Sequence, residues 1–104
     1  MNEIYINTSR YAYFDVYGAT AASTPTAEIQ LPGATATALV VTQVTGVIPD
    51  TATERWQAYI PMQFTMEEST FTVTWSATLG SESASKVDYF KVVTPYVTPE
   101  EIVA

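Results

Sequence analysis

The feature that most constrains the fold is a repeated alternation of apolar and polar residues with a period of two. In residues 71–79, Phe, Val, Trp, Ala and Leu occupy the odd positions, and threonine or serine occupies every even one. Residues 4–6, 11–17 and 55–60 alternate in the same way. Because successive side chains of a β-strand point to opposite faces, these segments are predicted to be strands with one buried face.

The remaining apolar segments are also typical of strands. Residues 27–31 and 87–93 alternate, and the second segment is expected to direct Phe90 and Val92 inward. Residues 38–45 are nearly all β-formers, which predicts a strand buried on both faces or lying at the centre of a sheet. Pro61 interrupts the alternation that runs through residues 55–64, which indicates an edge strand or a bulge.

Clusters of turn-forming residues separate these segments. They occur at residues 22–25, 31–34, 46–50, 66–69 and 80–85.

Short strands at this spacing predict an all-β fold, an antiparallel immunoglobulin-like β-sandwich of about seven strands. The sandwich is expected to span residues 1–93, and a small closed barrel is the competing architecture. A chain of 104 residues suffices for one domain with its own core. The residues expected in that core are Phe14, Trp56, Phe71, Trp75 and Phe90.

The C-terminal segment, residues 94–104, is predicted to be a linker followed by the start of a helix. Thr98 would be the N-cap, Pro99 the first helical residue and Glu101 the partner in a capping box. The helix would be too short to be stable alone, so it is expected to continue in a larger protein or to order against a partner; a frayed terminal turn is the alternative. The apolar residues expected to make contacts there are Tyr96, Val97, Ile102 and Val103.

Composition argues against several classes of function. The chain has no cysteine and no histidine, so thiol nucleophiles, zinc-thiolate sites, imidazole bases and histidine-ligated metals are excluded. Four basic residues against eleven acidic ones cannot neutralise a phosphate backbone, which argues against nucleic-acid binding. No apolar run is long enough to cross a membrane. Ser83 and Lys86 match a catalytic spacing, but they lie in a predicted loop. The chain is therefore predicted to be non-enzymatic, with no metal or cofactor.

Three tyrosines are the candidate binding residues. Tyr11, Tyr13 and Tyr17 have the parity opposite to Phe14 and Val16, so they are expected to line up on the outer face of one strand. Tyrosine is enriched at protein interfaces because it gives a large contact area at small entropic cost. Cross-strand packing is the structural alternative, and a platform for carbohydrate is the functional one.

Three stretches carry a resemblance to a known family. They are residues 56–61 (WQAYIP), 71–75 (FTVTW) and 88–102 (DYFKVVTPYVTPEEI). From about Ile29 to Ile102 the chain resembles the small Ig-like domains of tailed-bacteriophage virion proteins. The resemblance implies a sandwich, a proline-bounded linker and a helical head-tail connector segment, and it implies no catalytic residue.

The resemblance implies a structural component of a virion. Such a domain would lie at the neck or capsid surface and contact other virion proteins (capsid, portal or neck) in a multi-copy assembly. Two other hypotheses remain: a stand-alone binding module for carbohydrate or a cell-surface protein, and an adhesin-like or secreted spacer domain.

Overall fold

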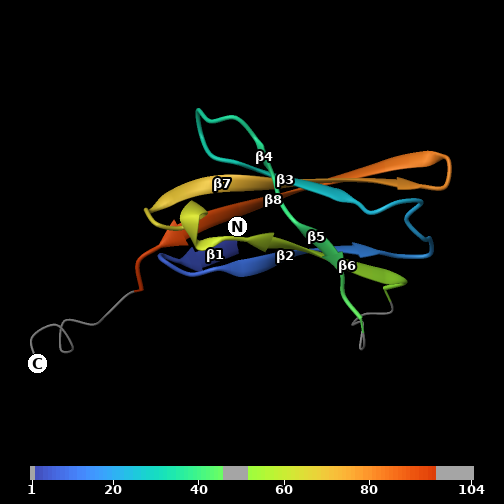
Figure 1. Ribbon diagram of the computed structural model, residues 1–104, viewed down its shortest axis with the longest axis horizontal. Coiled ribbons are helices and arrows are strands. Elements are labelled where there is room, and N and C mark those ends of the chain that lie inside the picture. The colour runs from blue at the N-terminus through green and yellow to red at the C-terminus, as the bar shows by residue number, and fades with distance from the viewer. Residues whose placement is uncertain (1, 46–51, 96–104) are drawn as a thin grey trace, which may run out of the picture.

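The computed structural model describes residues 2–45 and 52–95, and in that part of the chain the fold is all-β. The strands form one sheet of five, in the order β1-β8-β7-β3-β4, and one sheet of three, in the order β2-β6-β5. In Figure 1, β3, β7 and β8 lie above β2 and β6. The bounds of the strands are β1 Asn2–Tyr5, β2 Arg10–Val16, β3 Thr26–Gln30, β4 Thr37–Ala38, β5 Val41–Gln43, β6 Glu54–Ile60, β7 Ser69–Leu79 and β8 Glu82–Val93.

The core lies between the two sheets and is built from the inward positions that the alternation predicts. All five aromatic residues expected there are buried, and Trp75 has no exposed surface. Phe14 of β2 stacks on Trp75 of β7 with ring centroids 5.4 Å apart, which links one sheet to the other. Phe71 and Phe90 stack within the five-stranded sheet at 5.2 Å. The aliphatic core residues include Ile4, Val16, Ile29, Ala58, Ile60, Val73 and Val92.

Strands β7 and β8 form a long hairpin, and they are the two longest strands of the larger sheet. They pair antiparallel from Ser69 opposite Val92 to Leu79 opposite Glu82, so only two residues remain for the turn. Gly80, the first residue of the turn, has a φ of 66°. Glycine adopts this positive φ at the first central position of such turns without steric cost. The prediction of a loop over residues 80–85 was therefore wrong beyond the turn, because the serine-rich part continues the strand.

The prediction for residues 38–45 was also wrong. Instead of one central strand, this segment holds parts of two short edge strands: β4 ends at Ala38, and β5 spans Val41–Gln43. Between them the chain crosses from one sheet to the other. The Leu39 amide donates to Ala27 O in the larger sheet, and Val40 O accepts from the Tyr59 amide in the smaller one.

Pro61 marks the end of a strand and neither an edge nor a bulge. Strand β6 ends at Ile60 and lies between β2 and β5, so the expectation of an edge position was wrong. A 3-10 turn, η2, follows at Met62–Phe64. Thr65, which is fully buried, comes next; its carbonyl accepts from the Asn7 amide and its hydroxyl donates to Thr8 O, which joins the loop after β6 to the loop after β1.

Of four further expectations, two differ from the structure and two concern residues outside its described part. The chain has eight strands in its described part where about seven were predicted, and β1 pairs with β8 in parallel, so the sheets are not wholly antiparallel. The helix start predicted at Thr98, and the turn predicted at residues 46–50, lie outside the described residues.

The buried stack generates the first prediction. Trp75→Ala should lower the free energy of unfolding by about 3–5 kcal/mol, because it removes the largest fully buried side chain and leaves a cavity beneath Phe14. Chemical denaturation measures the change. The control is Tyr89→Ala, on the exposed face of β8, which should cost less than about 0.5 kcal/mol. Equal losses for the two variants would contradict the assigned core.

Candidate contact surface

The candidate functional site is the outer face of the three-stranded sheet. Strands β2 and β6 are paired so that Tyr11 lies opposite Tyr59, and Asp15 opposite Arg55. These positions alternate with buried ones, so their side chains share the exposed face. We call this surface the tyrosine face and define it as Tyr11, Tyr13, Asp15, Arg55, Gln57 and Tyr59.

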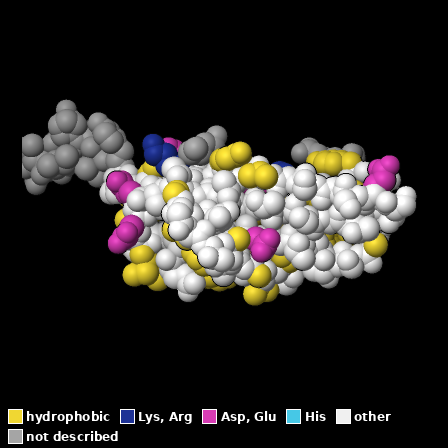
Figure 2. Space-filling view, turned by 90° about the horizontal axis from the view of Figure 1, so that it is seen from above, with side chains coloured by type: hydrophobic (Ala, Val, Ile, Leu, Met, Phe, Trp, Pro, Cys, Tyr) yellow, Lys and Arg dark blue, Asp and Glu magenta, His cyan; other side chains and the backbone are white. Residues whose placement is uncertain are grey.

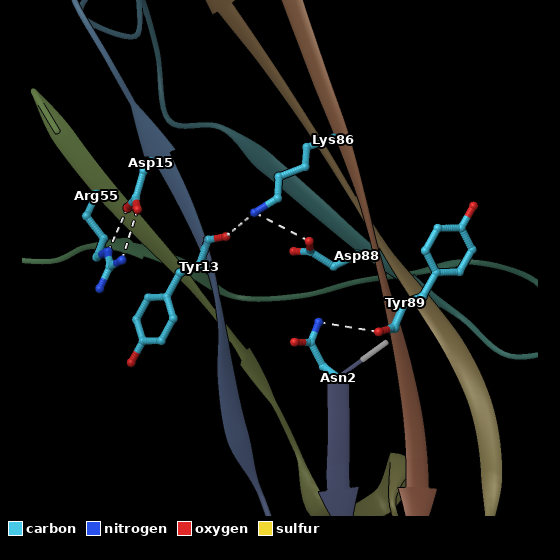
Figure 3. A network of polar contacts seen from close by, with 7 residues as sticks. All are labelled: Asn2, Tyr13, Asp15, Arg55, Lys86, Asp88 and Tyr89. Atoms are coloured by element: carbon cyan, nitrogen blue, oxygen red, sulfur yellow. Dashed lines mark hydrogen bonds and ion pairs between the residues drawn. The ribbon is translucent and has the colours of Figure 1, made fainter. Parts of the chain in front are cut away.

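The side chains of the tyrosine face hold one another in place. The Tyr11 and Tyr59 rings are tilted by 55° with centroids 5.5 Å apart. The guanidinium carbon of Arg55 lies 4.7 Å from the centre of the Tyr13 ring, which is a cation–π arrangement. Arg55 also donates two hydrogen bonds to Asp15: Nε to Oδ1 at 2.6 Å and Nη2 to Oδ2 at 2.9 Å (Figure 3). The face is therefore partly ordered before any partner binds.

The Asp15–Arg55 pair changes the acid–base behaviour of both residues. The hydrogen bonds from Arg55 hold the pKa of Asp15 below its ordinary value, although partial burial opposes this effect. The same hydrogen bonds raise the pKa of Arg55. Both groups are therefore charged at neutral pH, and together they add no net charge to the face.

The structure describes only some of the residues that were predicted to make contacts. Tyr11 and Tyr13 are both 41% exposed on β2, which confirms their predicted outward orientation, whereas Tyr17 is exposed but lies beyond the end of that strand. Tyr59 and Arg55 were not predicted as site residues because they come from another strand, although the alternation of residues 55–60 places their side chains on the face opposite to that of Trp56. The expected contact residues Tyr96, Val97, Ile102 and Val103 lie outside the described residues.

The outer face of the five-stranded sheet has a different chemistry. The outward positions of β7 are all hydroxyl residues, namely Thr70, Thr72, Thr74, Ser76 and Thr78. A shallow depression of about 360 Å³ lies beside them, between Leu31, Pro32 and Tyr89. In Figure 2, uncharged polar side chains and backbone dominate the visible surface, with separate acidic and hydrophobic side chains. In the described part of the chain, this surface offers hydrogen-bonding groups but no cluster of aromatic residues like that of the tyrosine face.

The described residues hold few arrangements suited to chemistry. Within residues 2–45 and 52–95 there is no group of three or more acidic side chains placed to share a metal ion. Ser83 and Lys86 occupy strand positions of opposite parity on β8 and cannot work as a pair. In the same part of the chain, no helix has the length and apolar character to cross a bilayer.

Comparisons with known proteins gave no match: no protein-family model, no curated protein and no solved structure is significantly similar to the chain.

The Asp15–Arg55 pair generates the second prediction, on pH. Because the folded pKa of Asp15 lies below its ordinary value of 3.8, the ionised carboxylate stabilises the fold above that pH. This contribution should disappear as the pH falls through the folded pKa. Asp15→Asn should therefore have a lower free energy of unfolding than the wild type at neutral pH. On acidification its free energy of unfolding should fall by less than that of the wild type, as measured by urea denaturation at several pH values.

Arg55→Met tests the cause of that pH dependence, since it removes the hydrogen-bond donor and keeps Asp15. Its stability should fall on acidification as gently as that of Asp15→Asn. Stability curves for both variants that run parallel to the wild type over the whole acid range would contradict the assignment.

Proposed function

We propose that the chain is an immunoglobulin-like, non-enzymatic domain that binds a neighbouring protein through its tyrosine face, as a structural component of a tailed-phage virion. The observation that carries the binding role is the ordered, exposed cluster of three tyrosines and one arginine. Tyrosine and arginine are the residue types that concentrate binding energy at protein interfaces. The virion context rests on the resemblance of residues 29–102 to phage Ig-like domains.

The strand order supports the immunoglobulin-like part of the proposal. An immunoglobulin domain has strands A, B, E and D in one sheet and C, F and G in the other. If β2, β3, β5, β6, β7 and β8 are given the letters B to G in chain order, the smaller sheet has the order B-E-D and the larger contains G-F-C. The short strand β4 then adds beyond C, and β1 beside G.

The core supports the same reading with different residues. Antibody domains join strands B and F by a disulfide across the sandwich. Here the B and F equivalents, β2 and β7, are joined by the Phe14–Trp75 stack. In place of the usual tryptophan of strand C, β3 has the aliphatic residues Ala27 and Ile29, and Trp75 of the neighbouring strand β7 fills the centre.

A carbohydrate partner is the second candidate, and one observation favours it. Tyr11 and Tyr13 are exposed on the same side of one strand, as stacking platforms for sugar rings require. The Asp15 carboxylate could then accept hydrogen bonds from sugar hydroxyls, and the Gln57 amide could accept or donate them. This candidate predicts selective signals on a glycan array that disappear with Tyr11→Ser, and a blank array would remove it.

The third prediction tests the virion proposal directly. In a density gradient of particles from the organism that encodes the chain, the chain should band with the tailed virions and their major capsid protein, as detected by antibody. Tyr11→Ser/Tyr13→Ser should reduce this association at least about tenfold, since aromatic anchors contribute more than 1 kcal/mol each.

The control for that experiment is Tyr5→Ser/Tyr89→Ser, which removes two exposed tyrosines of the larger sheet. It should leave the association unchanged. Recovery of the wild-type chain only in particle-free fractions would contradict the virion role, and equal losses in the two double variants would contradict the assignment to the tyrosine face.

A further inference from the structure

One side of the sandwich presents two open sheet edges. Strand β1 pairs with β8 only from Phe90 to Val93, so the stretch Glu82–Tyr89 has β7 on one side and no strand of the described chain on the other. Strand β2 is the corresponding edge of the smaller sheet. Figure 3 shows the two edges facing one another.

The backbone groups that face this open side can be assigned from the hydrogen bonds. Val93 O accepts from the Ile6 amide at 2.9 Å, and Tyr89 O accepts from the Asn2 side-chain amide at 3.3 Å. In an antiparallel ladder both polar groups of alternate residues point to the same side. The amides and carbonyls of the odd residues Ser83, Ser85 and Val87 therefore face outward from the sheet. Such a row is a template for pairing with another chain.

The inward side of this same stretch is charged. The parity that directs Phe90 and Val92 into the core also directs Lys86 and Asp88 inward. Lys86 Nζ lies 3.4 Å from Asp88 Oδ1, and it donates a hydrogen bond of 3.2 Å to Tyr13 O on the edge of β2 (Figure 3). The pair thus spans the space between the two edges.

The other exposed edges of the described chain have different features that oppose pairing with another chain. Strands β4 and β5, on the far side of the sandwich, have only two and three residues, which is too short for a stable new ladder. On the near side, side-chain donors occupy edge carbonyls: Arg10 bonds to Glu3 O at 2.8 Å, as Lys86 does to Tyr13 O. The long open stretch of β8 instead carries the inward-pointing charges of Lys86 and Asp88.

We propose that the Lys86–Asp88 pair prevents β8 from pairing edge to edge with β8 of a second copy of this chain. A second copy is the relevant partner because it offers the same open edge, so an antiparallel pair about a two-fold axis would satisfy both rows of edge groups. That pairing would close the side of the sandwich over Lys86 and Asp88 and remove both charges from water, which is unfavourable.

The test is Lys86→Val/Asp88→Val in the full chain, with molar mass measured by light scattering and sedimentation. The wild type should be a monomer, and the variant should dimerise at least about tenfold more tightly at equal concentration and ionic strength. The control Glu28→Val/Lys91→Val makes the same change in charge at outward positions of paired strands, and it should remain a monomer. Lys86→Thr/Asp88→Thr repeats the test if the valine variant does not fold.

Adding Val87→Pro to the dimerising variant distinguishes edge pairing from simple hydrophobic adhesion. The Val87 amide faces the open side, so proline costs no hydrogen bond within the monomer but removes one from the proposed ladder. The triple variant should be a monomer again. Folded charge-removal variants that stay monomeric, or a dimer that survives Val87→Pro, would overturn the proposal.

Discussion

The rest of the structure depends on the contact between Phe14 and Trp75. Among the described residues it is the one aromatic stack between the two sheets, in a chain that has no cysteine to join them covalently. Trp75 lies on β7, a central strand of the larger sheet, and its indole nitrogen is buried without a hydrogen-bond partner. An unpaired buried donor costs about 1–3 kcal/mol, so the packing of this ring must more than offset that loss.

The same alternation that fills the core determines the two outer faces. Strand β7 has large apolar residues inward and hydroxyl residues outward, whereas β2 has Phe14 inward and tyrosines outward. The two sheets therefore present surfaces of different chemistry to solvent. The tyrosine face combines aromatic area with a neutralised Asp15–Arg55 pair, which suits contact with another molecule better than a row of hydroxyl groups does.

Much of this arrangement was predictable from the sequence, because the strand period is local information. The parity of residues 11–17 and 71–79 placed every core aromatic of β2 and β7 correctly. The predictions that were wrong depended on contacts between segments far apart in the sequence. The β-forming residues 38–45 suggested one strand, buried on both faces or central, but Val40 is exposed, because the chain there crosses between the sheets and each half pairs with a different neighbour. Periodicity could not reveal that crossing.

The site shows the same limit. The sequence indicated a row of tyrosines on one strand, but Tyr59 and Arg55 join that row only through the pairing of β2 with β6. Nor could composition show that the serines of residues 83–85 extend a hairpin, since the register is fixed by Phe71 opposite Phe90 at the other end. Strand partners, and hence the surfaces they create, were decided by long-range packing.

The most direct test of this account is a double-mutant cycle between Phe14 and Trp75, with the free energy of unfolding measured for Phe14→Leu, Trp75→Leu and the double variant. If the stack joins the sheets, the two losses should not be additive, and the coupling should be about 0.5–1.5 kcal/mol. Additive losses, within about 0.3 kcal/mol, would show that the rings act independently and would contradict the account.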